Sequence, residues 1–246
     1  MQVERNQGIA GTFDLADQLA DLIGMEQQLA DIDGAKADAV RDEIVAAGGN
    51  AVSVQCDVSS EEQVKAAVDT AVATYGRLDG AVNIVGTNTD FSDLTAVSSE
   101  NFDKMCVINE RGMFYCMKYE LPVMKAQKYG SVINMGSAGA LFGQRLQGVY
   151  NATKFAVLGM TKAAALDFAA DGIRVNTVCP GPMLSDGMRY MLSKDPHFAD
   201  QYLVDVPMGR LIEQQEVANT FVFLLSDLSS GITGAAIPVD GVMAAD

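Results

Sequence analysis

Short apolar segments alternate with amphipathic helical segments along most of the chain. Alternation and β-branched residues predict strands at 51–58, 78–86, 131–137, 173–181 and 234–241. Apolar residues at helical spacing predict helices between them, at 59–76, 98–130, 150–172 and 213–227. Because strand and helix alternate, we expect a doubly wound α/β fold, with a parallel sheet and helices on both faces.

Capping residues support the helix boundaries. Ser59 or Ser60 suits the N-cap of the helix over 59–76, and Gly76 and Gly172 suit helix ends.

Pro122 is expected to interrupt the long helical region over 98–130. No repeat or Pro/Ser-rich linker divides the chain, so the sequence predicts a single domain over 1–246. In a doubly wound sheet the ligand lies outside the carboxyl ends of the strands, so the residues that follow each strand are the candidates for chemistry.

Charge narrows the classes of partner. The 17 basic and 32 acidic residues give a formal net charge of −15. Such a surface repels nucleic acids and anionic membranes, so we expect neither as a partner.

Cysteine and histidine usage narrows the chemistry further. The four cysteines lie far apart without a CxxC pair, which predicts neither a zinc site nor a disulfide framework and indicates a reducing, cytoplasmic setting. His197 is the one histidine, in the polar stretch "SKDPHFAD", and we expect it in an exposed loop. A histidine-rich metal site is excluded, and no metal is expected.

Ser137 and the pair Tyr150–Lys154 are the clearest candidates for catalysis. Ser137 ends a predicted strand, while Tyr150 opens a helix and shares one helix face with Lys154. A tyrosine ionises near about pH 10, and a nearby ammonium lowers that pKa, so Tyr150 would act as a general acid–base nearer neutral pH. Ser137 would donate a hydrogen bond to a substrate oxygen. A solvated helix face is the common reason for this Tyr–Lys spacing, so the catalytic interpretation needs further motifs.

Those motifs resemble the short-chain dehydrogenase/reductase family. "YNATK" is similar to its Tyr-x-x-x-Lys motif, and "NIVG" (Asn83–Gly86) to its NNAG-like motif. "VINERGMF" contains Asn109 where the family has a helix asparagine, and "RVNTVCPGPM" is similar to its RVNxxxPG stretch. The resemblance extends from about Leu29 to Asp240. It implies a Rossmann-like fold and an NAD(P)-dependent oxidoreductase.

The resemblance implies a role for each matching catalytic residue. Tyr150 would be the acid–base, and Lys154 would lower its pKa and bind the nicotinamide ribose. Ser137 would orient the substrate carbonyl, and Asn109 would hold a water in the proton relay.

The resemblance also implies a dinucleotide site. Asp31, in "LADID", would accept hydrogen bonds from the adenosine ribose hydroxyls, which favours NAD over NADP. Further cofactor contacts are expected at Ile32, Asp57, Val58, Asn83, Gly86, Tyr150, Pro180, Gly181, Met183 and Ser185.

Residues 1–28 depart from the family pattern. The family has a buried first strand and then a turn of the form T-G-x-x-x-G-x-G, whose glycines let the backbone approach the pyrophosphate. None of the 23 glycines here lie two apart, and "MQVER" is too polar for a strand buried on both faces. The second strand, "EQQLADI", is also unusually polar, and "TFDLADQLADLIG" has a helical stripe. The first strand and the glycine turn are therefore degenerate.

Two hypotheses account for this departure. The chain carries a local replacement or deletion, natural or arising in a cloned gene. Alternatively, "MQVER" forms a shortened strand, and "NQGIAG" is a reduced loop in which Gly8 and Gly11 bind phosphate.

The leading functional hypothesis is hydride transfer between a nicotinamide cofactor and a small alcohol or ketone. The segment 183–208 has the length of a mobile substrate lid, and its methionines indicate an apolar pocket. The family resemblance implies a homotetramer or homodimer.

Two other classes of function stay open. Halohydrin dehalogenases resemble this family but lack the glycine turn, although they carry arginine where Lys154 stands. The other alternative is a binding protein whose N-terminal segment no longer holds the cofactor.

Overall fold

A computed structural model describes residues 26–245 of the chain. The expectations for "MQVER", for Gly8 and Gly11, and for the helical stripe over 13–23 lie outside the described residues.

The described strands form two parallel sheets. A two-stranded sheet has the order β1-β2, and a four-stranded sheet has the order β3-β4-β5-β6. The strands are β1 (Glu26–Asp31), β2 (Asn50–Gln55), β3 (Gly80–Asn83), β4 (Gly130–Met135), β5 (Ile173–Pro180) and β6 (Ala236–Val239).

Helices connect these strands in the alternating order that the sequence predicts. They are α1 (Gly34–Ala46), α2 (Glu61–Tyr75), α3 (Ser99–Met105), α4 (Met113–Gln127), α5 (Gly148–Phe168), α6 (Asp186–Lys194), α7 (Asp200–Leu203) and α8 (Gln214–Leu225). Shorter turns are η2 (Cys106–Gly112), η3 (Ala138–Ala140), η4 (Ala169–Asp171) and η5 (Asp227–Ser229). The sequence pattern did not predict α1, because its buried stripe is only Ala37, Val40 and Ile44.

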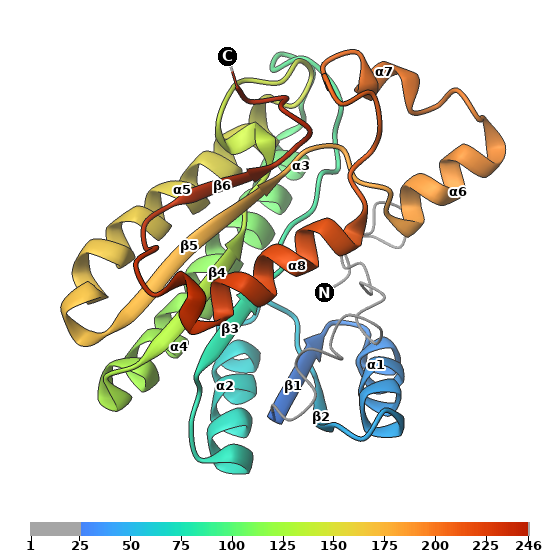
Figure 1. Ribbon diagram of the computed structural model, residues 1–246. Helices are drawn as coiled ribbons and strands as arrows, with labels where there is room; N and C mark the ends of the chain where they lie inside the picture. The colour runs from blue at the N-terminus through green and yellow to red at the C-terminus, as the bar shows by residue number, and fades with distance from the viewer. Residues whose placement is uncertain (1–25, 246) are drawn as a thin grey trace.

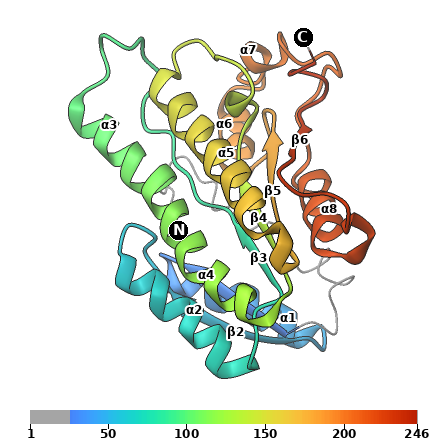
Figure 2. The ribbon, with the colours of Figure 1, turned by 90° about the vertical axis from the view of Figure 1, so that its left-hand side faces the viewer.

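Helices cover both faces of the strands. Helices α4 and α5 lie on one side of the four-stranded sheet and α8 on the other (Figures 1 and 2). Val64 and Ala67 of α2 join the core of the α4–α5 side, while Val222 of α8 packs against the cluster under α1. The doubly wound α/β class expected from the sequence is therefore confirmed.

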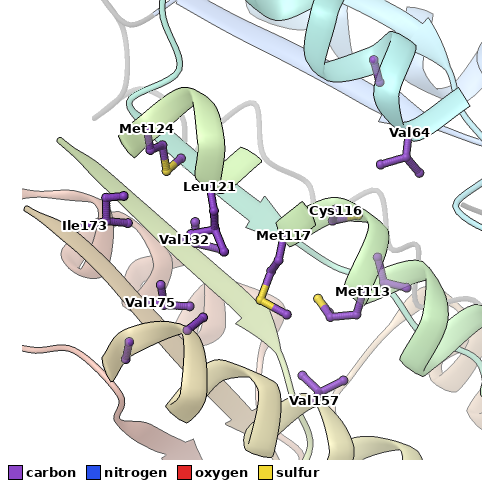
Figure 3. Packing of buried hydrophobic residues seen from close by; sticks show 14 of the residues in the cluster. Val64, Met113, Cys116, Met117, Leu121, Met124, Val132, Val157, Ile173 and Val175 are labelled. Atoms are coloured by element: carbon purple, nitrogen blue, oxygen red, sulfur yellow. The ribbon is translucent and has the colours of Figure 1, made fainter. Parts of the chain in front are cut away.

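The larger core lies between the four-stranded sheet and helices α4 and α5. Met113, Met117 and Met124 are buried on α4 and share a cluster with Val132 of β4 and Val175 of β5, which pair in register (Figure 3). Every residue of β4 is buried, as expected for a central parallel strand covered on both faces.

The polar sequence "EQQLAD" does form a strand, β1, and hydrogen bonds tie this strand to α2. The Gln28 amide donates to the Ala67 carbonyl at 2.8 Å, and the Tyr75 hydroxyl donates to the Gln27 carbonyl at 2.8 Å. Both partners come from α2. Parallel pairing with β2 satisfies backbone groups along one edge of β1, with Leu29 opposite Ser53.

The helix boundaries at the predicted caps are confirmed. The Ser60 side chain accepts from the Gln63 backbone N–H at the start of α2, and Gly76 ends that helix with a φ of 77°. Gly172 ends the turn after α5 with a φ of 76°. A left-handed φ of this kind favours glycine.

The expected interruption at Pro122 is wrong. Helix α4 continues through Pro122, where the neighbours Leu121 and Met124 are buried and hold the helix against the sheet. Packing therefore compensates for the missing backbone donor. The irregular part of this helical region is the π-helical turn η2, and it contains Asn109. Such turns are frequent at functional sites.

Candidate active site

A cavity of about 400 Å³ opens at the carboxyl ends of β3, β4 and β5. The segments after these strands, the start of α5, and the α6–α7 segment form its wall. Helices α6 and α7 project beyond that end of the sheet (Figure 1). Ser137, Tyr150 and Lys154 all line this cavity, so the fold brings the three predicted catalytic residues together.

Ser137 is held in place by the turn that follows β4. Its backbone is extended, and its side-chain oxygen accepts a hydrogen bond from the Gly139 backbone N–H at 3.1 Å, which caps η3. A serine hydroxyl that accepts in this way keeps its own O–H as a donor. Ser137 and Tyr150 line the same cavity, and the Ser137 hydroxyl acts to lower the pKa of Tyr150.

Lys154 is anchored between two strand ends. It is 2% exposed, and its ammonium donates to the carbonyls of Val85 and Met135, each at 2.9 Å. The same ammonium lies 5.8 Å from the centre of the Tyr150 ring. A Cβ atom on Gly86 would lie 2.7 Å from the Lys154 nitrogen, so glycine is what lets the chain after β3 pass this close.

Burial disfavours the charged forms of both Tyr150 and Lys154, so it shifts the pKa values of both residues. The pKa of Tyr150 is raised, because burial disfavours the phenolate more than the Ser137 hydroxyl favours it. The expectation of a lowered tyrosine pKa is therefore wrong for this protein. Burial also lowers the pKa of Lys154 to about 8, so its charge is lost under mildly alkaline conditions.

Asn109 organises the backbone beside the catalytic pair. It is fully buried in the π-helical turn; its Oδ1 accepts from the Thr87 backbone N–H at 2.6 Å, and its Nδ2 donates to the Thr87 carbonyl at 2.8 Å. Nδ2 also donates to the Thr153 hydroxyl at 3.0 Å, and that hydroxyl donates to the Tyr150 carbonyl at 2.8 Å. Both N–H groups of the amide are used, so they are not available for the water of the implied relay.

The cofactor residues expected after β5 also meet at the cavity. Pro180, Gly181, Met183 and Ser185 line it, together with Gly86. Gly181 packs closely on the chain after β6, since a Cβ there would lie 2.9 Å from the Asp240 Cα. Ser185 caps α6 by accepting from the Met188 backbone N–H at 3.3 Å.

Asn83 does not line the cavity. Its side chain is buried and donates to Glu120 at 2.9 Å and to Asn134 at 3.1 Å. Asn83, the first residue of "NIVG", therefore joins β3 to α4 and β4.

Four further cofactor candidates lie at the carboxyl ends of the two-stranded sheet. Asp31 accepts from the Asp33 backbone N–H at 2.7 Å, and Ile32 follows it. Asp57 accepts from the Ser59 backbone N–H at 2.8 Å. Val58 packs beside Gly112, where a Cβ would approach it to 3.0 Å. They lie outside the cavity wall.

The opposite wall of the cavity is apolar. Its members come from the segment that includes α6 and α7, and they are Met183, Met188, Met191, Phe198 and Tyr202. His197 is exposed and contacts Asp200 at 3.0 Å, as the sequence predicts for a surface loop.

Sequence reasoning missed several polar residues at the cavity. Thr87 lines it, and its hydroxyl is buried without a hydrogen-bond partner among the residues described. Asn88, Gln144 and Gln147 also line it. Thr87 and Asn88 directly follow "NIVG" at the carboxyl end of a strand, and this position could have identified them as ligand-facing residues.

Within residues 26–245, no cluster of three or more histidine, cysteine or acidic residues is arranged to hold a metal ion. The same range contains no helix with the length and apolar character needed to cross a membrane. All four cysteines are free thiols.

Helices cover both faces of the parallel strands (Figure 1), and a serine, a tyrosine and a lysine line the cavity at the carboxyl ends of those strands. This arrangement is typical of one class of oxidoreductase. A sequence profile described as Enoyl-(Acyl carrier protein) reductase matches residues 3–243. The chain belongs to the short-chain dehydrogenase/reductase family. It is accordingly an oxidoreductase of that family.

Named relatives and a solved structure agree with this assignment. A 2,5-dichloro-2,5-cyclohexadiene-1,4-diol dehydrogenase of Sphingobium indicum is 37% identical over 220 residues, which cover 89% of this chain and 86% of the relative. A cyclohexanol dehydrogenase of an Acinetobacter species, strain SE19, is 37% identical over 224 residues, with coverages of 89% and 84%. The structure of ElxO with NADP bound superimposes with a TM-score of 0.89 at 28% identity and covers 96% of this chain and 95% of that one.

Proposed function

We propose that this protein interconverts an apolar secondary alcohol, of the alicyclic class, and its ketone by hydride exchange with a nicotinamide dinucleotide. The observation that carries the proposal is that Ser137 and Tyr150 line one cavity with the buried ammonium of Lys154, which lies 5.8 Å from the centre of the Tyr150 ring. These groups provide a hydrogen-bond donor for the substrate oxygen and a proton donor for the reaction.

The residues around Lys154 fit a nicotinamide nucleotide. Lys154 uses two of its three N–H groups on Val85 and Met135, which leaves one for a ribose hydroxyl. Gly86 leaves space beside the ammonium, and the Thr87 hydroxyl is buried at the cavity without a partner in the described structure. Pro180, Gly181, Met183 and Ser185 would hold the nicotinamide end. When bound, the nicotinamide supplies or accepts the hydride.

NAD is favoured over NADP by the charge at the carboxyl end of β1. Asp31 and Asp33 place two carboxylates there, which would accept hydrogen bonds from ribose hydroxyls and repel an additional phosphate. ElxO, the similar structure, binds NADP, so the preference is a property to be measured on this chain.

The proton steps follow from the arrangement of the side chains. Ser137 would bind the carbonyl oxygen, and Tyr150 would donate its proton to that oxygen as the hydride arrives at carbon. A raised tyrosine pKa keeps Tyr150 protonated at neutral pH, which suits carbonyl reduction. Alcohol oxidation requires the phenolate, so we expect it to accelerate as the pH rises.

The substrate class is supported by the cavity wall and by the relatives. Met183, Met188, Met191 and Phe198 provide an apolar, adaptable surface. Both named relatives act on alcohols of six-membered carbon rings. We propose the segment 183–208 as the lid that covers such a substrate.

Exposed aromatic residues support the expected homo-oligomer. Phe114 of α4 and Phe155 of α5 are each 46% exposed, and a second copy of the chain would cover them. Sedimentation of the purified chain tests this part of the proposal.

A fluorescence titration with NADH and NADPH tests the cofactor and the function. We expect saturable binding of NADH, weaker binding of NADPH, and loss of both in Lys154→Ala. Cyclohexanol and cyclohexanone then serve as first substrates. If neither nucleotide binds at millimolar concentration, the redox proposal is wrong, and the dehalogenase-like or binding-protein alternatives apply.

A further inference from the structure

Three side-chain amides line the catalytic cavity, and the proton steps above use none of them. Asn88 comes from the chain after β3, while Gln144 and Gln147 come from the loop that leads into α5. Gln147 lies three residues before Tyr150. The cavity therefore has a second polar region besides the one formed by Ser137 and Tyr150.

Asn88 holds Gln147 in a defined orientation. The Asn88 Nδ2 donates to the Gln147 Oε1 at 3.0 Å. The Asn88 Oδ1 accepts from the Asp90 backbone N–H at 3.4 Å, which fixes the direction of the amide. Because the oxygen of Gln147 accepts from Asn88, its nitrogen is the end that remains for another partner.

The loop that presents Gln147 is built at a conformational cost. Leu146 has a φ of 60°, a left-handed conformation that is unfavourable for leucine. Gln147 occupies the N-cap position of α5, yet its side chain makes no capping hydrogen bond. The side chain thus serves neither the helix nor its own loop, and backbone strain of this kind is typical of functional sites.

The amide nitrogen of Gln147 has no hydrogen-bond partner within residues 26–245. The residue is partly exposed and lines the cavity, so this donor is open to a ligand. Gln144 adds a second amide at the cavity. Its Oε1 lies close to Gly139, because a Cβ atom built on Gly139 would be 2.6 Å from it, and Gly139 belongs to the turn that positions Ser137.

We propose that Gln147, oriented by Asn88, binds a second oxygen substituent of the substrate. The preferred substrates would then be alicyclic diols, hydroxyketones or diketones. Their ring would lie against the apolar wall that contains Met183, Met188 and Met191, and their second oxygen would accept from the Gln147 amide nitrogen. A simple alcohol such as cyclohexanol would bury the Gln147 N–H groups without a partner, and an unpaired polar group discriminates strongly against such a ligand. This inference rests on the proposed function and refines its substrate.

The test compares cyclohexanol with cyclohexane-1,2-, 1,3- and 1,4-diol. For the wild-type chain with NAD, we expect at least one diol to have a kcat/KM about tenfold above that of cyclohexanol. Gln147→Leu removes the donor and Gln147→Glu keeps only acceptors, so both should lower the diol-to-cyclohexanol ratio about tenfold. Gln215→Leu, on the exposed surface of α8, should leave the ratio unchanged. A wild-type ratio near one for every diol, or a ratio that survives both Gln147 changes, overturns the inference.

Calorimetric binding separates this inference from the proposed function. If no cyclic alcohol is oxidised with either nucleotide, the proposed function is wrong, but the amides can still recognise a diol. Tighter binding of a diol than of cyclohexanol, lost in both Gln147 variants, would then support the inference alone. Equal binding of diol and cyclohexanol would refute it.

Discussion

At the scale of single residues, burial decides how Tyr150 and Lys154 ionise. A lysine on the same helix face predicts a lowered tyrosine pKa, but burial raises the pKa of Tyr150. Burial also lowers the pKa of Lys154 to about 8. The ammonium is therefore close to its own titration in the physiological range. Its main contribution below pH 8 is a fixed positive charge held by two backbone carbonyls.

Removing the Tyr150 hydroxyl should abolish most of the turnover. Tyr150→Phe keeps the ring beside Lys154 but removes the transferable proton, and general acid–base catalysis of this kind contributes about 10²–10⁴-fold. We expect kcat to fall by that order, while NADH affinity stays within about threefold. Tyr129→Phe, in an exposed position away from the cavity, is the matched control. Turnover of Tyr150→Phe at the wild-type rate would refute the assigned role.

At the scale of elements, the site depends on how closely β3, β4 and α5 approach one another. Lys154 of α5 reaches the carbonyls after β3 and at the end of β4, and Asn109 in η2 fixes the chain after β3. Thr153 links that asparagine to the backbone of Tyr150. The π-helical turn is thus part of the site, because it carries the amide that ties these elements together.

Gly86→Ala should damage the site through a single added methyl group. That carbon would lie 2.7 Å from the Lys154 nitrogen, so the ammonium must leave at least one of its two carbonyl partners. We expect NADH affinity to fall at least about tenfold, measured by the same fluorescence titration.

Gly159→Ala is the control for this change. Gly159 lies within α5, and nothing lies within 4 Å of an added Cβ. Alanine should therefore stabilise the helix by about 0.5–1 kcal/mol and preserve NADH binding. If Gly86→Ala binds NADH like the control, the close approach is not required for the cofactor.

At the scale of the whole molecule, a buried polar network crosses the core from α4 to β5. Glu120 accepts from Asn83, and the Asn83 amide also donates to Asn134. Asn134 donates to Thr161 of α5, which accepts from Thr177 of β5. Burial raises the pKa of Glu120 to about 7 from its ordinary 4.5. The network therefore links folding stability to pH.

The sign of this linkage follows from the direction of the shift. The folded pKa of Glu120 lies above the unfolded one, so the folded chain binds more protons between pH 4.5 and 7. The stability it contributes is complete below pH 4.5 and is lost as the pH rises through 7, by on the order of 3 kcal/mol. Cys116 nearby does not titrate in this window, because burial raises the pKa of its thiol well above 9.

Glu120→Gln should remove most of that dependence. Glutamine keeps an oxygen for Asn83 and carries no charge, so the variant should match the wild type at pH 5 and be more stable at pH 8. Urea unfolding at both pH values measures the difference, and Glu62→Gln on the exposed surface of α2 is the control. An equal stability difference at pH 5 and pH 8 would contradict the linkage.

The sequence by itself determined the features that depend on local spacing. Alternating strand and helix patterns indicated the doubly wound fold, and the four-residue interval placed Tyr150 and Lys154 on one helix face. Ser137 was recognisable because it ends a strand, where ligands bind in such sheets. These features repeat with the periods of the backbone, so neighbouring residues suffice to predict them.

Only the tertiary structure decided what depends on segments far apart in the chain. Packing against the sheet carried α4 through Pro122, and the buried surroundings set the directions of the Tyr150 and Lys154 pKa values. Asn83 turned into the core toward Glu120, and Gln147 met Asn88 at the cavity although 59 residues separate them. Desolvation and long-range hydrogen bonds arise from three-dimensional neighbours, and no local pattern in the sequence specifies which neighbours those are.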